Sequence, residues 1–417
     1  MGGKILFLSI MDFTDKGIQV VRRTPEYLAR HGWNVHYLVL RDESQSGSYY
    51  YQNRIFPENI MVHRFRMPRI KAFDKIYSRN LKVIYSKVRG YISVIRLAQL
   101  ALKLNKEADF DVFYGAGPHG LLAAHIAKLF LMPKSGKKIV GRFYGVWNLY
   151  SEYIQDKNYW KLFLNADILL ALFLRADHYI ITNDGTQGDK ALKWLRSANC
   201  RKLSFWVNGI DKFEHVLYDE DYSESGISIR AKAICVTRLI PAKNVSFAIK
   251  AARIVICEMG FSNFSLVIVG DGDDRVNLQN LVSRFGIEEQ VHFLGAIENE
   301  EVQMLLLNCD IFFSTNNVSN VGNPLLEAIR AHKIIFTLNN GDTGSWIEHE
   351  KNGFIYDVNL TAVERMAQDV GRIITDSNFR KLILNGVAKL EESRLWTWEE
   401  RLHAEHSILI RLLGKKG

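Results

Sequence analysis

The sequence predicts two tandem α/β domains, each built on a doubly wound parallel sheet. At 417 residues the chain is too long for one ordinary hydrophobic core, so two domains are the default expectation. Short apolar strands alternate with helical segments, and this alternation stops once and then restarts. A hydrophobic share of 47% is typical of compact globular domains and argues against disorder.

The N-terminal half contains the first series of alternating elements. Apolar runs predict strands at 4–10, 34–40, 111–114, 138–144, 178–182 and 203–207, with helices at 17–30 and 119–130. The turn sequence Asn208-Gly209-Ile210-Asp211 ends the series. We therefore expect an N-terminal domain at 1–211 and place the linker in the polar, acidic segment 212–230.

The C-terminal half repeats the pattern. Strands are expected at 233–237, 266–269, 291–294, 310–313 and 334–338, and helices at 244–258, 298–307 and 324–331. This gives a second domain at 231–395, and we expect an amphipathic helix at about 396–417 to pack back on the first domain. Parallel sheets bind ligands at the carboxyl ends of their strands, so the site is expected in a cleft between the domains.

The net charge of +9 is unevenly distributed along the chain. Residues 1–210 carry 32 Lys and Arg against 16 Asp and Glu, whereas the remainder carries 22 against 29. Residues 59–106 hold twelve basic residues and one acid, Asp74, mixed with aliphatic and aromatic residues. This mixture suits an anionic membrane surface. A plain solvated basic face is the alternative, and no nucleic-acid-binding module is recognisable.

The chain is expected to be a cytoplasmic protein without a membrane span. Its beginning runs directly into a predicted strand, so no signal peptide is expected. The most apolar stretch, 160–181, is interrupted by five polar or charged residues, too many for a transmembrane helix. The four cysteines have neither paired nor metal-like spacing, which indicates reduced thiols.

The segment Gly322-Asn323-Pro324-Leu325-Leu326-Glu327-Ala328 is the most informative motif. A glycine opens a helix whose first backbone N–H groups can bind a phosphate. The Glu327 carboxylate one turn later can accept hydrogen bonds from two vicinal hydroxyls of a ribose or sugar. Phosphate and diol together describe a nucleotide-sugar, although an ordinary Pro-containing helix start is an equally good reading of the segment alone.

Two further segments follow predicted strands of the C-terminal half. Two cations, Arg238 and Lys243, are expected at the carboxyl edge of a parallel sheet. There they can bind a diphosphate and stabilise its charge when it is the leaving group. The alternative is a pair of ordinary surface cations. The run Gly270-Asp271-Gly272-Asp273 lets backbone approach a ligand closely, and its acids lack the further ligands that a metal site needs.

Taken in order, these motifs resemble the GT4 glycosyltransferases. The resemblance rests on Arg238 and Lys243, 267–272, 291–295, Gly322 to Ala328 and 352–354, and it is specific only in the C-terminal domain. It implies a GT-B fold, a donor site in the C-terminal domain and an acceptor site in the N-terminal domain. Arg238 and Lys243 would hold the diphosphate and Glu327 the ribose. Backbone would hold the base at Val291, His292 and Phe293, and the phosphate and sugar at Gly322, Asn323, Leu325 and Leu326.

The sequence departs from the family pattern at two places. Where the family usually has a second acid that binds the transferred sugar, this chain has Ser319. Where the family often has a His-Gly-like pair, it has Arg142-Phe143-Tyr144-Gly145, so Arg142 and Tyr144 are candidates for the acceptor side. His119 is the alternative catalytic histidine, or else it caps a helix. Gly17 lies in a loop near the expected leaving diphosphate, or in a plain turn.

The reading that follows is a retaining glycosyltransferase that moves a sugar from a nucleoside-diphosphate sugar, with a UDP-sugar favoured, to an acceptor hydroxyl. No metal or cofactor is expected. The acceptor would be lipid-linked or a polysaccharide at the inner membrane face, with no nucleic acid involved. Two alternatives stay open: an inactive nucleotide-sugar-binding partner protein, and another GT-B enzyme such as a nucleotide-sugar epimerase.

Overall fold

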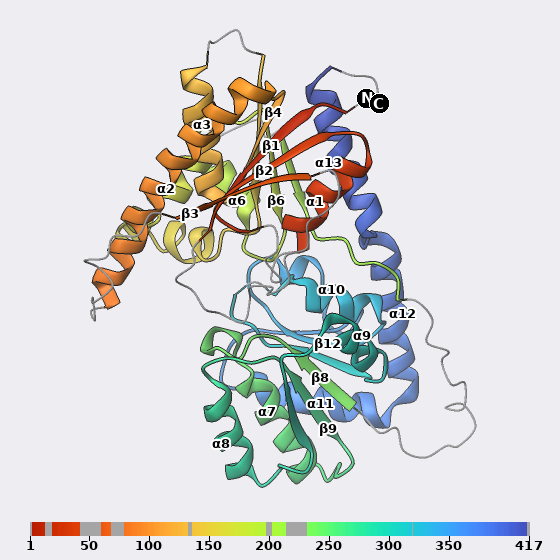
Figure 1. The fold of residues 1–417 in the computed structure, drawn as a ribbon. Coiled ribbons are helices and arrows are strands. Elements are labelled where there is room, and N and C mark those ends of the chain that lie inside the picture. Colours follow the sequence, from red (N-terminus) through yellow and green to blue (C-terminus); the bar gives the residue numbers. More distant parts are fainter. Residues whose placement is uncertain are drawn as a thin grey trace. The chain divides into compact units, whose positions relative to one another are not determined.

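The computed structural model describes residues 2–12, 19–41, 60–67, 79–131, 136–196, 202–213, 232–318 and 320–414 (Figure 1). These residues form two compact units. Unit 1 consists of residues 1–183, 187–208 and 399–417, and unit 2 of residues 184–186 and 209–398. The predicted linker at 212–230 falls almost entirely outside the described residues.

Unit 1 contains a parallel sheet of seven strands among its described residues, in the order β3-β2-β1-β4-β5-β6-β7. Most of its inner strands are apolar and buried along nearly their whole length, because helices cover both faces of a doubly wound sheet. The strands are β1 Lys4–Ser9, β2 Asn34–Arg41, β3 Ile60–Arg66, β4 Val112–Ala116, β5 Lys138–Phe143, β6 His178–Thr182 and β7 Leu203–Trp206.

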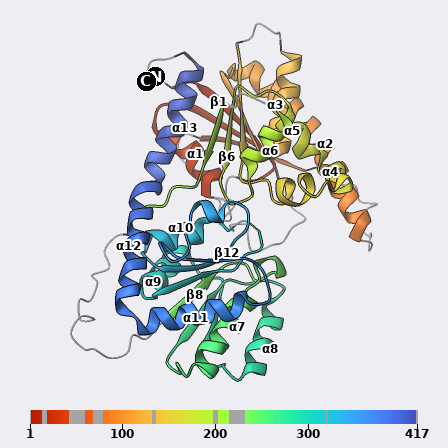
Figure 2. The same ribbon diagram turned by 180° about the vertical axis from the view of Figure 1, so that it is seen from behind.

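Helices cover the two faces of this sheet, and alternate residues of each strand point to opposite faces. Leu6 and Leu8 of β1 pack in the core beneath α2 Arg79–Ala108, α3 Gly117–Phe130, α5 Ala166–Phe173 and α6 Gly188–Leu195. Ile5 and Phe7 pack in the opposite core beneath α1 Gln19–Arg30 and the last helix, α13 Trp398–Leu412. Figure 2 shows α4 Tyr159–Leu164 beside α5 and α2.

A buried polar network fastens α13 to the sheet of unit 1. The Glu405 carboxylate on α13 is fully buried, accepts a hydrogen bond from the Tyr114 hydroxyl on β4, and forms an ion pair with Arg401. Thr24 of α1 lies 3.5 Å from the same carboxylate. Burying a carboxylate is strongly unfavourable unless it is paired, and these partners remove that penalty.

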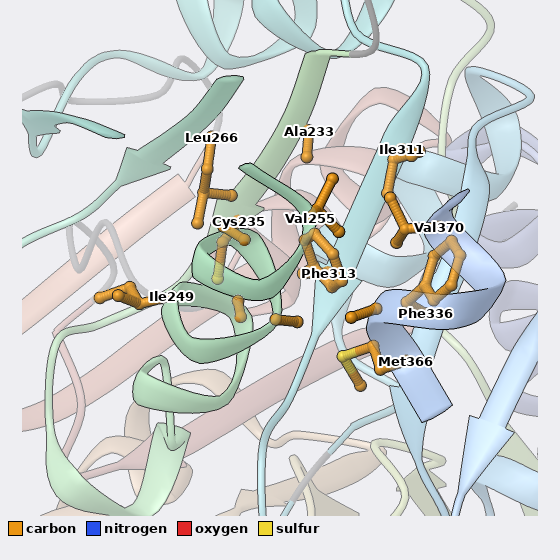
Figure 3. Packing of buried hydrophobic residues seen from close by; sticks show 14 of the residues in the cluster. Ala233, Cys235, Ile249, Val255, Leu266, Ile311, Phe313, Phe336, Met366 and Val370 are labelled. Carbon is orange, nitrogen blue, oxygen red and sulfur yellow. The ribbon is translucent and has the colours of Figure 1, made fainter. Parts of the chain in front are cut away.

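Unit 2 contains a second parallel sheet, with six strands in the order β10-β9-β8-β11-β12-β13 among the described residues. The strands are β8 Lys232–Val236, β9 Ser265–Val269, β10 Val291–Gly295, β11 Ile311–Ser314, β12 Ile334–Leu338 and β13 Phe354–Tyr356. The helices are α7 Ser246–Arg253, α8 Arg275–Phe285, α9 Asn299–Leu307, α10 Asn323–Arg330, α11 Ala362–Thr375 and α12 Ser377–Arg394. Figure 3 shows Phe313 and Phe336 of the sheet packed against helix residues such as Val255, Met366 and Val370.

The predicted fold class of two doubly wound α/β domains is confirmed. The predicted strands at 178–182 and 334–338 have the bounds of β6 and β12, and most of the other predicted strands agree within two residues. The 30-residue helix α2 was not predicted, nor were β3, β13, α6, α8, α11 and α12. None of the described helices combines the length and the apolar character needed to cross a membrane.

Candidate functional site

The candidate site lies at the carboxyl edge of the sheet of unit 2. The ends of β8 and β11 and the beginning of α10 enclose a cavity of about 110 Å³ there. Backbone and side chains of these elements line it: Cys235, Val236, Thr237, Lys243, Phe313, Ser314, Asn316, Asn320, Gly322, Pro324 and Leu325. The structure therefore brings Lys243 and Gly322, which are far apart in sequence, to one cavity.

Lys243 is the cation of this cavity. It ends the short turn Pro241–Lys243, and its Nζ lies 3.5 Å from the carbonyl oxygen of Val318. Burial, followed by the positive charge of Arg238, lowers the pKa of Lys243 to about 8, while Asp184 acts in the opposite direction. An ammonium with so little local compensation gains from binding an anion such as a phosphate. Arg238 itself is exposed at the end of the same loop.

The glycines of Gly270-Asp271-Gly272 let this backbone pack closely against the loop after β8, which contains Thr237 and Leu239. A Cβ at Gly270 would lie 1.8 Å from the carbonyl oxygen of Thr237, and one at Gly272 would lie 2.2 Å from that of Leu239. The Leu239 amide also donates to the Asp271 carbonyl at 2.9 Å. The φ angles of +128° and +157° favour glycine at both positions. These residues therefore hold the loop that carries Arg238.

Glu327 lies in the first turns of α10 and is only 5% exposed. Its carboxylate makes no hydrogen bond to any residue that the structure describes, and burial raises its pKa to about 7. Burying a carboxylate without a hydrogen-bond partner lowers the stability of the protein. Such a group is typical of a binding site in which hydroxyl or cationic atoms of a ligand supply the partner.

The first turn of α10 uses some of the donors that we expected to bind the phosphate. The amides of Leu325 and Leu326 both donate to the Gly322 carbonyl, at 3.1 and 3.2 Å. Pro324 has no N–H, so the Gly322 amide and the positive end of the helix are the elements of this turn that suit an anionic ligand.

Amide side chains hold the loop before α10. Asn320 is buried, and its side-chain amide donates to the Leu338 carbonyl at 3.3 Å and to Asn340 Oδ1 at 3.1 Å. The Asn340 amide in turn donates to the Asn316 carbonyl at 2.6 Å. Asn320 is therefore committed to protein contacts rather than to a sugar, and Ser319 lies outside the described residues.

A segment that the sequence did not indicate also contributes to this edge of unit 2. The Val321 amide donates to the Asp184 carbonyl at 3.2 Å, and the Asp342 amide donates to the Gly185 carbonyl at 3.3 Å. The Asp184 carboxylate accepts bonds from the amide and the hydroxyl of Thr186. The Asn-Asp-Gly-Thr turn after β6 was the available signal, but nothing in the sequence related it to residues 316–342.

The residues predicted to bind the base, Val291, His292 and Phe293, line a different hollow from Lys243 and Gly322, and their role stays a prediction. The register pairs Val291 with Leu266 near the start of β9, and Gly295 with Val269 at its end. Val291 and His292 therefore lie in the amino-terminal half of β10, where they line a separate hollow of about 390 Å³ with Phe293 and α8. At the carboxyl edge, the Gly295 carbonyl accepts a bond from the Gly270 amide at 2.8 Å.

The histidine candidate in unit 1 is held between helices. His119 Nε2 lies 3.7 Å from the Asp167 carboxylate at the start of α5, and the same carboxylate forms an ion pair with Lys87 of α2 at 2.9 Å. A Cβ at Gly90 of α2 would lie 2.5 Å from the His119 ring. Burial lowers the pKa of His119, against the charge of Asp167. This geometry favours an interhelical packing role over a catalytic one.

Arg142 is wholly buried in unit 1, and Tyr144 lies beneath its guanidinium. The guanidinium donates to the carbonyls of Phe143 and Ile180 and to the Thr182 hydroxyl, so it supports the sheet rather than an acceptor. Burial raises the pKa of Tyr144. The remaining N-terminal candidate, Gly17, lies outside the described residues.

The described residues do not show the pattern of a metal site. Within the described residues there is no group of three or more His, Cys, Asp and Glu side chains that could hold a metal ion.

Comparisons with known proteins show what the C-terminal half of the chain resembles. The profile of the family described as "Glycosyl transferases group 1" matches residues 222–386. This segment is similar to the group 1 glycosyl transferases. An uncharacterized glycosyltransferase of Methanocaldococcus jannaschii is 26% identical over 241 residues, 54% of this chain and 60% of that protein.

Two further similar proteins are informative. A GDP-mannose-dependent α-(1-6)-phosphatidylinositol monomannoside mannosyltransferase of Mycobacterium tuberculosis is 24% identical over 177 residues, 41% of this chain and 45% of its own length. The crystal structure of Anabaena HepE in complex with UDP and glucose has a TM-score of 0.66 at 16% identity, covering 99% of this chain and 100% of that one. This last likeness shows the fold, which is GT-B.

The group 1 match has a limited extent. The matched segments span about half the length of the two curated relatives. Arg238, Lys243 and Glu327 lie inside the family match at 222–386, whereas His119 and Arg142 lie outside it. The match therefore bears on the site in unit 2 and does not extend to unit 1.

Proposed function

We propose that this protein is a retaining glycosyltransferase that moves a sugar from a nucleoside-diphosphate sugar to an acceptor hydroxyl. The observation that carries the proposal is the cavity at the carboxyl edge of unit 2, where the half-buried Lys243 ammonium meets the beginning of α10. The nearby carboxylate of Glu327, also on α10, is buried and unpartnered among the described residues. A diphosphate and a ribose complement these two groups.

The roles of the residues follow from their charges and positions. Lys243 and Arg238 bind the diphosphate and stabilise the negative charge that develops on it as the sugar leaves. Glu327 accepts hydrogen bonds from the ribose hydroxyls, and the Gly322 and Asn323 amides at the start of α10 face the phosphate or sugar. The base lies against the backbone that follows Gly270 and Gly295. Metal independence is part of this proposal, because two cations already neutralise the diphosphate.

The nucleotide and the acceptor are finer parts of the proposal. A UDP-sugar is favoured, with the UDP complex of the similar HepE structure as support, and GDP-mannose is the competing donor named for the mycobacterial relative. The phosphatidylinositol mannoside in that relative's name supports a lipid-linked acceptor, bound by unit 1 as the acceptor domain while unit 2 serves as the donor domain. The basic stretch 59–106 would then hold the enzyme peripherally at the inner face of the membrane, for glycolipid or surface-polysaccharide assembly.

A panel of nucleotide-sugars tests the donor site. UDP- and GDP-sugars are added separately, and the melting temperature is recorded, because a ligand that binds only the folded state raises apparent stability by mass action. We expect a rise with one nucleotide class and none with the Arg238→Ala/Lys243→Ala double variant. A panel without any shift, measured on protein with a normal unfolding transition, would remove the proposal.

The second candidate function is a nucleotide-sugar-binding protein without transferase activity. Ser319 favours it, because a hydroxyl replaces the acid usually found at the sugar. Release of free nucleoside diphosphate separates the candidates: a transferase releases it only when an acceptor is present, and a pure binding protein never does. A GT-B epimerase would instead convert the nucleotide-sugar into its epimer without any acceptor and without net release of nucleoside diphosphate.

A further inference from the structure

The outer side of α4 in unit 1 consists largely of exposed aromatic side chains. Tyr159, Trp160 and Phe163 are 73%, 67% and 69% exposed, and the rings of Trp160 and Phe163 stack with their centroids 5.9 Å apart. Single exposed apolar residues are normal on protein surfaces, but a contiguous group of large ones marks an interaction site.

The next helix, α5, continues this surface. Leu170 and Phe173 are 46% and 60% exposed, while Ala171 and Leu172 on the inner side are fully buried in the core. The helix therefore has one apolar side buried on unit 1 and a second apolar side that is largely exposed.

Helix α2 also has one buried and one exposed apolar side, along a much greater length. Val94, Leu97, Ala98 and Ala101 are buried at helical spacing and face the core. A second stripe repeats every three or four residues and stays exposed by 39–55%: Leu81, Ile84, Val88, Tyr91 and Ile95. We call this stripe, together with Tyr159, Trp160, Phe163, Leu170 and Phe173, the outer apolar face.

Polar contacts place the α2 stripe beside α4 and α5. Lys87 Nζ lies 2.9 Å from the Asp167 carboxylate and 3.3 Å from Asn165 Oδ1, at the junction of α4 and α5. Burial and then the Asp167 charge raise the pKa of Tyr91, which belongs to the exposed stripe. Figure 2 shows α2, α4 and α5 on one side of unit 1.

The positive charge around the outer apolar face indicates which kind of partner it binds. Helices α2, α4 and α5 contain eight Lys and Arg but only two acids, Glu107 and Asp167. Asp167 is already paired with Lys87. A second copy of this chain would bring the same positive excess, and like charges would oppose the pairing. An anionic lipid surface supplies the opposite charge together with an apolar layer for Trp, Tyr and Phe.

We propose that the outer apolar face inserts its aromatic and aliphatic side chains into the interfacial layer of an anionic lipid membrane. This goes beyond electrostatic attraction of the basic stretch 59–106, because insertion adds a contribution that salt does not screen. The inference does not depend on the transfer reaction, so an inactive protein would still bind in this way.

Vesicle binding of the full chain tests insertion. Flotation with phosphatidylcholine vesicles, with and without phosphatidylglycerol, is measured from ~0.1 M to ~1 M salt. We expect binding to the anionic vesicles that weakens with salt but persists. Trp160→Ser/Phe163→Ser should lower the partition coefficient by roughly ten-fold or more. Both side chains project into solvent, so this variant should keep the melting temperature of the wild type.

The matched control is Met304→Ser/Leu360→Ser, which removes two apolar side chains of unit 2 that are 62% and 96% exposed. It should bind vesicles like the wild type. Lipids brominated in the acyl chains should quench part of the tryptophan fluorescence, and Trp160→Phe should remove most of that quenching.

Three outcomes would overturn the proposal. Binding that high salt abolishes, with the Trp160 and Phe163 variant equal to wild type, would reduce the surface to a purely electrostatic one. Equal losses in the variant and the control would remove the specificity of the face. A dimer in sedimentation equilibrium that the variant dissociates, without vesicle binding, would assign the face to a second copy of the chain.

Discussion

Replacing Glu327 with glutamine should stabilise the ligand-free protein at alkaline pH. The carboxylate is 5% exposed and has no hydrogen-bond partner among the described residues, and burial raises its pKa from 4.5 to about 7. Each unit corresponds to roughly 1.4 kcal/mol, so the ionised carboxylate lowers the free energy of unfolding by about 3 kcal/mol. Glutamine has nearly the same shape and no charge.

The sign of the pH dependence follows from the raised pKa. The favourable contribution of Glu327 is complete below pH 4.5 and is lost as pH rises through about 7. Wild type and Glu327→Gln should therefore melt at similar temperatures near the acidic end of this window, and the variant should melt higher above it. For a unit of this size, about 3 kcal/mol corresponds to roughly 6–12 °C in calorimetry.

The same substitution should weaken the binding of a nucleotide-sugar, because a neutral amide accepts weaker hydrogen bonds from hydroxyls than a carboxylate does. A loss of roughly 1–2 kcal/mol, or about 5- to 30-fold in Kd, is expected by titration calorimetry. Glu405→Gln is the matched control, since Glu405 is also buried but paired with Arg401, and it should lower the melting temperature. A Glu327→Gln shift that is the same at both ends of the pH window would refute the reasoning.

Three other substitutions have defined outcomes. Because burial lowers the pKa of Lys243 to about 8, donor affinity should fall as pH rises through that value, and Lys243→Arg should flatten the profile in titrations on either side of it. Gly270→Ala, whose Cβ would lie 1.8 Å from a carbonyl oxygen, should cost roughly 3 kcal/mol or more in urea unfolding, against about 1 kcal/mol for Gly286→Ala in open space. Tyr114→Phe should lose roughly 1–3 kcal/mol of stability by leaving Glu405 short of a donor, and an unchanged unfolding midpoint would contradict that role.

The alternation of apolar runs was sufficient to predict both sheets, because parallel strands covered on two faces must be apolar throughout. Helix α2 escaped prediction because its apolar residues occupy two stripes, and this obscures the simple amphipathic period. The strand β13 is three residues long, which is too short to give a periodic signal.

Local motifs located the candidate site better than isolated residues did. Lys243 and Gly322 each lie next to a strand or helix end, so the rule for parallel sheets brought them together. His119 shows the opposite case, since its contacts with Asp167 and Gly90 depend on helix packing that the sequence does not reveal. The contribution of Asp184 depends in the same way on contacts between segments more than a hundred residues apart.

The attachment of α13 to the first sheet has a consequence for synthesis on the ribosome. Tyr114 and Thr24 are made early, yet Glu405 and Arg401, which complete their buried network, are made only after unit 2 has been translated. The core of unit 1 therefore stays incompletely packed while unit 2 is translated. A nascent chain that stops after residue 398 should remain sensitive to proteases and dependent on chaperones, because unit 1 completes its packing only once α13 has been made.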